Sequence, residues 1–169
     1  MNLRRSKQAM NDFAKYVIQQ SRSNLTKGKK NVSKDLYNSL KSEINPTQKG
    51  LLLFFEMLEY GVYQDQGVSG TKKKYDTPFK YTNKRPNIGA LDKWSVRKSA
   101  LNKKVRDKKG RFIPRKSLIY LIANKIFFQG IRPSLFFTKP FEKRFNTFIN
   151  EFEVGVTEDF ENDLQDEKG

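Results

Sequence analysis

Hydrophobic residues recur at helical spacing near the start of the chain. They stand at positions i, i+3, i+4 and i+7, namely Met10, Phe13, Ala14 and Val17. Side chains with this spacing share one face of a helix, so the pattern predicts an N-terminal helix over about residues 5–22. The polar, glycine-containing stretch "SNLTKGKKNVSKD" that follows is typical of a loop.

The next apolar segments indicate a β-hairpin. "LYNSLKSEI" is followed by "NPTQKG" and then by "LLLFFEM". Asn-Pro and a later Gly are favourable turn residues, so we expect a hairpin that pairs about residues 37–45 with 50–57. Residues 51–55 are all apolar, which is typical of a strand covered on both faces and predicts a central position in a sheet.

Further helices are expected after the hairpin. "EMLEYGVYQDQGVSG" favours a short helix that ends where Gly67 and Gly70 permit positive φ angles. "SLIYLIANKIFFQG" predicts a helix over 117–129, followed by Gly130 as its C-terminal residue and by Pro133, which prevents continuation. The stripe that predicts a last helix over about 138–153 consists of Phe141, Phe145, Phe148, Ile149 and Phe152.

Together these elements predict an α+β fold. A small antiparallel sheet, the hairpin within about 37–57, is packed by the N-terminal, central (117–129) and C-terminal (138–153) helices. No internal repeat is visible in the sequence.

The expected organisation is one domain followed by a tail. Residues 1–150 form the α+β domain, in which 71–116 is inserted as a long basic loop, and residues 151–169 form an acidic tail. Inside the loop, the apolar island "IGALDKWSV" predicts one or two helical turns around Trp94. We expect the remainder of the loop to be exposed and mobile, because it concentrates like charges.

The formal net charge of +16 is unevenly distributed. Residues 151–169 hold 8 of the 18 acidic residues and one Lys, or −7, whereas residues 1–150 hold 33 Lys and Arg against 10 acids, or +23. Such a split suggests contact with a polyanion or an acidic partner. The acidic tail is then either disordered or shields a basic surface.

The segment 72–116 allows three interpretations. Its Lys and Arg form a solvated surface, contact nucleic acid without sequence preference, or dock on an acidic partner protein. The chain has no zinc-finger spacing, RNA-binding aromatic signature or heptads behind a basic helix. The aromatic residues available for base stacking are Tyr75, Phe79, Tyr81 and Phe112. The predicted contacts to a polyanion or acidic partner are Lys72, Lys73, Lys74, Lys103, Lys104, Arg106, Lys108, Lys109 and Arg111.

The sequence gives no support to catalysis. It contains no Cys and no His, which removes the commonest nucleophiles, bases and metal ligands. Glu56, Glu59 and Asp65 could serve a metal-dependent nuclease, but the two glutamates fit the solvent face of an apolar stretch better. "GVSGTKKK" lacks the spacing of a phosphate-binding P-loop. We therefore expect no enzyme, no cofactor and no metal.

The chain is expected in a cytoplasm, with later incorporation into a particle left open. No apolar run approaches the roughly 20 residues that span a bilayer. The start "MNLRRSKQAMNDF" has charges but no apolar segment of a signal peptide behind them. We expect no membrane partner.

Several segments, taken in order, resemble the tail-completion family of tailed bacteriophages, the small head–tail joining proteins of the neck. "TKGKKNVSKDLYNSL" stands where that family enters a strand, and "YGVYQDQGVSGT" where it has a "Y..yvefGt" element. "NIGALDKWSVRK" stands in place of a "p…l..W…k" segment. "LIANKIFFQGIRPSLFFTKPF" is similar to the closing pattern "iA..I...G..p.pF…a". The resemblance covers roughly residues 1–150, and order and spacing both agree.

The chain departs from the family pattern at three places. Gln64, Asp65 and Gln66 stand where the family often has a glutamate. The loop 71–116 is long and unusually basic, and the acidic tail is extra. These departures concern the contacts with partners more than the fold.

The resemblance implies a structural virion protein whose hallmark is a corner of helix, Gly, Pro-containing loop, aromatic and helix. Copies made in the host cytoplasm would form a six- or twelve-fold ring in the neck, between the portal or adaptor and the tail-tube or tail-terminator proteins. The ring would pass close to packaged double-stranded DNA. The subunit or partner interface that it implies comprises Tyr60, Tyr63, Gln64, Asp65, Gly67, Trp94, Gly130, Arg132, Pro133, Phe136 and Phe137.

Other interpretations stay open beside this one. Core packing is the ordinary explanation for the corner residues Phe127, Phe136 and Phe137. The whole chain could instead be a non-sequence-specific nucleic-acid-binding accessory protein, which its strong positive charge and interspersed aromatics favour. Under the neck hypothesis, the charge split favours head-to-tail assembly in which the acidic tail binds a neighbour's basic loop.

Overall fold

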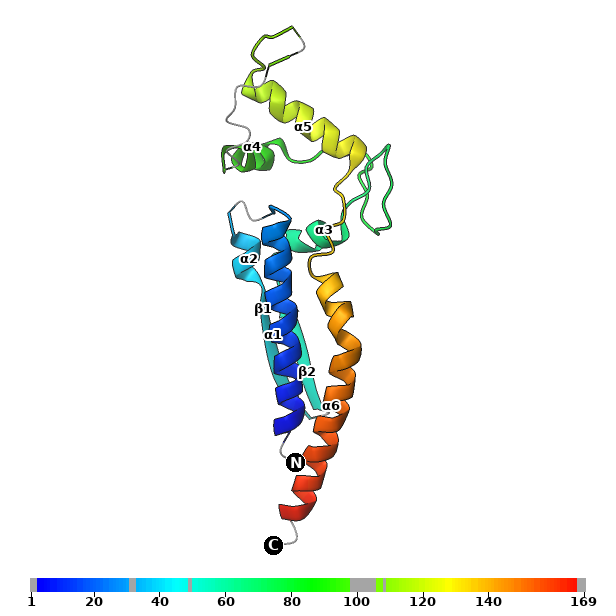
Figure 1. Ribbon diagram of the computed structural model, residues 1–169. Helices are drawn as coiled ribbons and strands as arrows, with labels where there is room; N and C mark the ends of the chain where they lie inside the picture. Colours follow the sequence, from blue (N-terminus) through cyan, green and yellow to red (C-terminus); the bar gives the residue numbers. More distant parts are fainter. Residues whose placement is uncertain (1–2, 31–32, 49, 98–105, 108, 167–169) are drawn as a thin grey trace. The chain divides into compact units, whose positions relative to one another are not determined.

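The computed structural model describes residues 3–30, 33–48, 50–97, 106–107 and 109–166 (Figure 1). The chain forms two compact units, which we describe separately. The helix–hairpin unit comprises Met1–Lys30, Asp35–Leu58 and Leu135–Gly169, and the basic unit comprises Asn31–Lys34 and Glu59–Ser134. The first unit contains α1 (Arg4–Lys27), α2 (Asp35–Ser39), β1 (Lys41–Thr47), β2 (Gly50–Glu56) and α6 (Thr138–Asp166). The second contains α3 (Tyr60–Gln66), α4 (Ile88–Arg97) and α5 (Arg115–Gln129).

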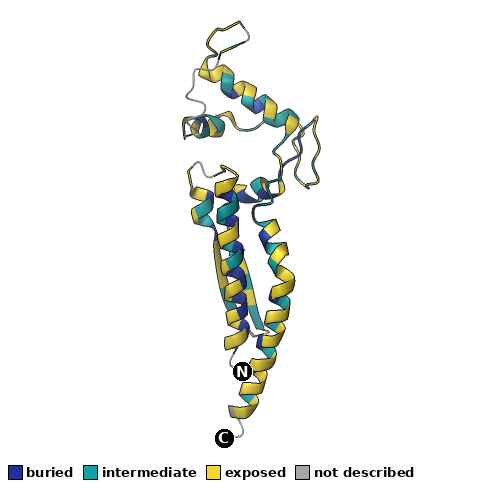
Figure 2. Ribbon diagram, in the orientation of Figure 1, coloured by how far each residue is buried: buried dark blue, intermediate teal, exposed yellow. Residues whose placement is uncertain are grey.

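An aromatic core joins α1, α6 and the hairpin. Phe13 of α1 is 1% exposed, and its ring stacks on that of Phe148 in α6 with 4.4 Å between centroids. Phe141 of α6 and Phe55 of β2 meet the Phe13 ring edge-on, at 5.2 and 6.1 Å. Such ring geometries add to the gain from burial, and Figure 2 shows the buried residues that run along α1. The predicted α+β class is confirmed, and the N-terminal helix continues to Lys27.

The hairpin turns one face to this core and the other outward. Leu53 and Phe55 pack against the core, whereas Leu52 and Phe54 are 49% and 45% exposed. This alternation is the two-residue period of a β-strand. The central position predicted for residues 51–55 was wrong, because the sheet in the described part of the chain has only the two antiparallel strands β1 and β2.

The start of the predicted hairpin is helical instead. Residues 37–39 belong to α2, and β1 begins at Lys41. Arg22 of α1 holds α2 in place by donating hydrogen bonds to the carbonyl oxygens of Tyr37 and Leu40, each at 3.1 Å. These tertiary contacts override the strand pattern. The buried cluster beneath α2 consists of Leu25, Leu36, Leu40 and Phe136.

Helix α6 continues to Asp166 instead of ending near residue 153, so residues 151–166 are not a disordered tail. At Gly155 the helix comes so close to α1 that a Cβ would lie 3.0 Å from the Ser6 amide nitrogen. One turn later, Asp159 accepts hydrogen bonds from the N–H groups of Arg5 and Ser6, both at 2.8 Å, and from the Ser6 hydroxyl at 2.7 Å. Asp159 therefore caps the first turn of α1 from a distant helix.

The Asp159 carboxylate is ionised in spite of its burial. Burial, at 2% exposure, acts to raise its pKa. The hydrogen bonds from the Ser6 and Arg5 amides and the Ser6 hydroxyl, together with the Arg5 charge, outweigh this and lower the pKa below its ordinary value. The negative charge also lies at the positive end of the α1 dipole, where it is favourable.

In the basic unit, α4 and α5 are tied together by Arg115. Its guanidinium donates to the Asp92 carboxylate at 2.9 Å and to the Ser95 hydroxyl at 3.1 Å. The helices predicted around Trp94 and over 117–129 are confirmed, and Gly130 ends α5 with a φ of 73°. Within the described residues, no helix has both the length and the apolar character that a membrane span requires.

We expect Asp159→Ala to lower the free energy of unfolding by about 2 kcal/mol at pH 7, because α1 loses its cap and the buried Ser6 amide and the part-buried Arg5 amide lose their acceptor. Urea denaturation followed by circular dichroism measures this change. The folded-state pKa is lowered, so the contribution of Asp159 is complete above the unfolded pKa of about 4 and is lost as pH falls through the folded pKa. The difference between the two proteins should therefore shrink below about pH 4.

Glu158→Gln is the matched control for this experiment. Glu158 is the neighbouring acid on α6 and forms an exposed ion pair with Arg5 at 3.3 Å. Exposed pairs of this kind contribute less than about 1 kcal/mol. Equal losses of stability in the two variants would contradict a capping role for Asp159.

Candidate functional site

Two segments of the basic unit that are far apart in sequence meet at their backbones. Val68 and Ile131 exchange a reciprocal pair of hydrogen bonds, N–H to carbonyl oxygen, both at 2.8 Å. The amides of Thr71 and Lys72 extend the contact by donating to the carbonyl oxygens of Phe127 and Phe128, at 3.0 and 2.9 Å. The segment after α3 is thereby fixed along the end of α5.

Glycine makes this approach possible, and we call the contact the glycine junction, after Gly67, Gly70 and Gly130. A Cβ on Gly130 would collide with the carbonyl oxygen of Val68, and one on Gly70 with that of Phe128. At Gly67 it would lie 2.6 Å from the Ile131 carbonyl oxygen. Gly67 and Gly130 also have φ angles of 77° and 73°, which favour glycine.

Side-chain hydroxyls fix the loops around the junction. Ser134 Oγ donates to the carbonyl oxygen of Gln64 at 2.6 Å. Ser69 is buried, and its backbone pairs with residues 79 and 81 through hydrogen bonds of 2.8 and 2.9 Å. Thr77 Oγ1 donates to the Gly67 carbonyl oxygen at 3.0 Å. These bonds hold residues 75–81 of the basic loop against the junction.

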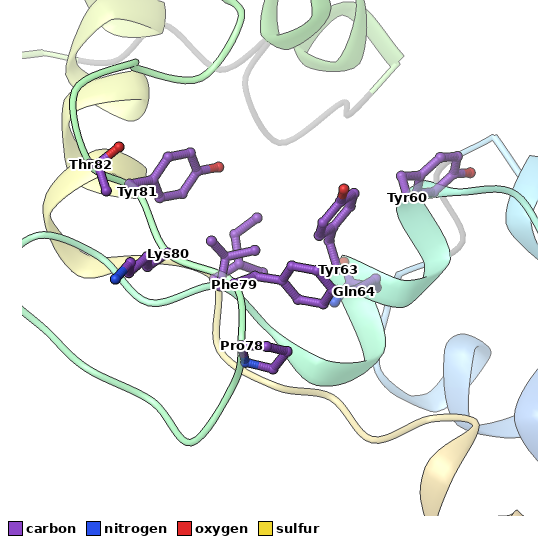
Figure 3. Close-up of a pocket in the computed structure, with 10 residues that line it drawn as sticks. Tyr60, Tyr63, Gln64, Pro78, Phe79, Lys80, Tyr81 and Thr82 are labelled. Carbon is purple, nitrogen blue, oxygen red and sulfur yellow. The ribbon is translucent and has the colours of Figure 1, made fainter.

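The junction supports a mainly apolar hollow of about 700 Å³, which we call the aromatic groove. Figure 3 shows Tyr60 and Tyr63, from α3, beside the segment 78–82 that forms the other wall. The rings of Tyr63 and Phe79 meet edge-on at 4.7 Å. The groove is lined by Tyr60, Tyr63, Gln64, Val68, Pro78, Phe79, Lys80, Tyr81, Thr82 and Ile131.

Polar groups are few in the aromatic groove. Burial raises the pKa of the Tyr81 hydroxyl above its ordinary value, so the phenol stays neutral at physiological pH. The Nε2 atom of Gln64 is buried and finds no acceptor among the described residues. A buried donor without an acceptor costs roughly 1–3 kcal/mol. Lys80 adds positive charge to the wall.

The structure separates the predicted interface residues into groups. Tyr60, Tyr63 and Gln64 line the groove, and the first two are 48% and 37% exposed. Gly67 and Gly130 form the junction, with Pro133 against Gly67.

The remaining predicted interface residues lie elsewhere. Asp65 is buried at 4% exposure, Arg132 is exposed, and Trp94 is half-buried in α4. Phe136 is buried in the core cluster of the helix–hairpin unit, and Phe137 packs partly buried against it. The structure thus favours the packing interpretation for these two rings.

Several predicted basic contacts lie over aromatic rings. Lys72 Nζ is 4.9 Å from the centroid of Phe128, Lys73 Nζ is 5.4 Å from that of Tyr75, and the Arg106 guanidinium is 4.3 Å from that of Phe112. Cation–π contact of this kind stabilises the fold without neutralising the charge. Lys74 and Lys109 are exposed. Lys103, Lys104 and Lys108 lie outside the described residues.

A tight turn holds Arg106 and Arg111 near each other. Asp107 Oδ1 accepts hydrogen bonds from the Lys109 and Arg111 amides, both at 2.9 Å, and Oδ2 accepts one from the Arg111 side chain at 3.0 Å. The hydrogen bond from the Arg111 backbone N–H is the main reason that the pKa of Asp107 is lowered. The turn therefore presents its basic side chains around an ionised acid.

Sequence reasoning found one wall of the aromatic groove and part of the other. Phe79 and Tyr81 were considered as stacking residues, and Ile131 lies in the corner 130–137 that was expected to be a contact surface, but Val68, Pro78 and Thr82 were not expected at a site. The alternation of Phe79 and Tyr81 in "TPFKYT" is a strand-like signal that would have marked this wall. The pairing of Val68 with Ile131 has no comparable signal, because it joins two irregular segments.

The described part of the chain contains no candidate metal site. No group of three or more Asp or Glu side chains lies together there in a way that could hold a metal ion. The acids Glu56, Glu59 and Asp65, weighed above as nuclease ligands, form no such group.

Comparisons with protein-family models, with curated proteins and with solved structures each found no match for this chain. The resemblance to the tail-completion family therefore depends on the sequence segments quoted above.

We expect Gly130→Ala to destabilise the basic unit by about 3 kcal/mol, because the new Cβ meets backbone at the junction and the φ angle is positive. Thermal unfolding followed by the fluorescence of Trp94, the one tryptophan of the sequence, measures this change. Gly110→Ala is the control, since Gly110 has a similar φ of 78° but nothing within 4 Å of a built Cβ. Equal destabilisation by the two substitutions would show that close packing at the junction is unimportant.

Proposed function

We propose that this chain is a structural subunit of the neck of a tailed bacteriophage, where copies form a ring that joins or completes head and tail. The observation that carries the proposal is the glycine junction. It brings together "YGVYQDQGVSGT" and "LIANKIFFQGIRPSLFF", two of the segments on which the family resemblance depends. Three glycines of these segments, Gly67, Gly70 and Gly130, are explained by the same backbone contact.

The character of the site supports a binding role. The aromatic groove exposes Tyr60 and Tyr63 beside an apolar hollow and carries few polar groups. Exposed aromatic side chains on a rigid support are typical anchors of protein–protein interfaces. Because the junction fixes the backbone on which the groove is built, the anchors are held in place before a partner arrives.

The charge distribution supports assembly from identical copies. The segment Glu59–Ser134 holds 19 Lys and Arg against 5 Asp and Glu, whereas residues 151–166 hold 7 acids and no base. Two surfaces of opposite charge on one chain allow a heterologous contact that repeats around a ring. In this proposal the protein has no catalytic activity and no cofactor, and its other partners are the portal or adaptor and the tail-tube or tail-terminator proteins.

A second candidate function is non-sequence-specific binding of nucleic acid. The observation that favours it is the exposed run Lys72, Lys73 and Lys74 beside Tyr75, together with the basic turn at Arg106 and Arg111. Phosphates would be neutralised by these side chains, and exposed rings could stack on bases. In a neck ring the same residues would pass close to packaged DNA.

We expect this protein in purified particles of the phage that encodes it, at a copy number consistent with a six- or twelve-fold ring. Quantitative mass spectrometry against the major capsid protein and the portal measures the ratio. The reason is that a ring subunit is retained in fixed stoichiometry, whereas a DNA-binding accessory protein made in the cell is not.

The contrary result is absence from the particles. If the protein also bound DNA with micromolar or tighter affinity that weakened steeply with salt, the second candidate would replace the first. Replacement of Lys72, Lys73 and Lys74 by Gln would then reduce both the affinity and its dependence on salt.

A further inference from the structure

We propose that residues 151–166, here called the acidic arm, dock in the aromatic groove of a second copy of this chain. The inference rests on the proposed function, because it names the two surfaces by which copies would join head to tail. It commits to one partner, a second copy, and to one geometry, a helix lying in a groove.

The acidic arm has the surface of a docking helix. Phe160 and Leu164 are 54% and 43% exposed although both are large and apolar. They are four residues apart, so they share one side of α6 and form a continuous apolar anchor. Glu153 and Glu161 are exposed around this anchor, whereas Glu151 and Glu158 pair with Arg144 and Arg5, which lie outside the arm.

The arm is held rigidly in this presentation. Asp159 accepts three hydrogen bonds from the first turn of α1, and Gly155 lies in close contact with the same turn. These contacts hold one side of the helix against α1 and leave Phe160 and Leu164 exposed. A helix that is already formed and fixed loses little conformational entropy when it docks.

The aromatic groove complements this helix in apolar character and in charge. Its walls offer the rings of Tyr60, Tyr63 and Phe79 to apolar anchors, and Lys80 lines it as a cation. It belongs to a segment with an excess of 14 positive charges, 19 minus 5. The attraction between this segment and the exposed acids of the arm, such as Glu153 and Glu161, would speed the encounter and fix its direction. After a change of rotamer, the unsatisfied Gln64 amide could donate to a carboxylate of the arm.

A second copy is the occupant that these observations favour. Every copy carries one arm and one groove, so the same contact can repeat from subunit to subunit and closes into a ring if the rotation allows. Nucleic acid could use the basic surface and stack bases on Phe79 and Tyr81. Only a second copy would also cover the exposed apolar pair Phe160 and Leu164 on the acidic arm.

The absence of cysteine from the sequence allows a direct test by cross-linking. One full-length protein carries Thr157→Cys, on the anchor side of the arm, and a second, isotope-labelled protein carries Thr82→Cys, in the groove wall. The two are mixed at low salt and treated with a short bismaleimide, and the products are identified by mass. We expect the mixed dimer to exceed both symmetric dimers, and its yield to fall as salt is added.

Substitutions of the anchor give the decisive comparison. Phe160→Ser with Leu164→Ser in the Thr157→Cys protein should reduce the yield of mixed dimer at least about tenfold, because two apolar side chains are no longer buried. Val154→Ser is the matched control, since Val154 is also apolar and 58% exposed on α6 but lies outside the anchor pair. Circular dichroism checks that all the variants fold.

Three outcomes would overturn the inference. These are a mixed dimer no more abundant than the symmetric ones, a yield that Phe160→Ser with Leu164→Ser leaves unchanged, and a doubly substituted chain that cross-links only within itself. Failure here is distinguishable from failure of the proposed function. A protein present in particles in ring stoichiometry without this cross-link would keep its place in the neck and lose the arm–groove contact. A cross-linked dimer of a protein that is absent from particles would support the arm–groove contact and contradict the proposed place in the neck.

Discussion

The contact between the backbones of Val68 and Ile131 is the constraint on which the basic unit depends. Beside this contact the two backbones lie so close that a Cβ on Gly67, Gly70 or Gly130 would collide with the opposite chain segment. The same contact fixes the end of α5 and, through Ser69, the loop that carries Phe79 and Tyr81. The aromatic groove is therefore a consequence of the junction, and a change at one of these glycines should alter the groove even though no glycine binds a partner.

In the helix–hairpin unit, a charged side chain holds the last turns of α6 against α1. The core of this unit is aromatic, but the last turns of α6 contain few core residues and many acids. One of these acids, Asp159, caps α1 and thereby fixes a segment that would otherwise gain little from burial. Glu153 and Glu161 stay exposed and are opposite in sign to the basic unit. One arrangement thus serves stability within a chain and, in our proposal, recognition between chains.

The parts of the fold that could be predicted are those with a strong local pattern. The periodic apolar residues of α1 and α5 and the turn segment "NPTQKG" indicated the correct elements, although Asn45, Pro46 and Thr47 lie in β1 and not in the turn. Residues 37–39 were expected in a strand but belong to α2, because Arg22 and the cluster around Phe136 hold them. The length of α6 depends on Asp159, whose partners are more than 150 residues away and leave no local signal. At the site, the resemblance predicted Tyr60, Tyr63 and Gln64. Pro78 and Thr82 of the opposite groove wall could not be predicted, because only the folded loop brings them near these three residues.

A reconstruction of the phage neck by cryo-electron microscopy would test the central claim most directly, namely that this chain is a ring subunit which uses the aromatic groove as a contact surface. Our account predicts a closed ring of copies in the neck, with the groove of each copy covered by α6 of its neighbour. A neck in which no ring fits this chain, or a ring in which the groove faces solvent in every copy, would contradict it.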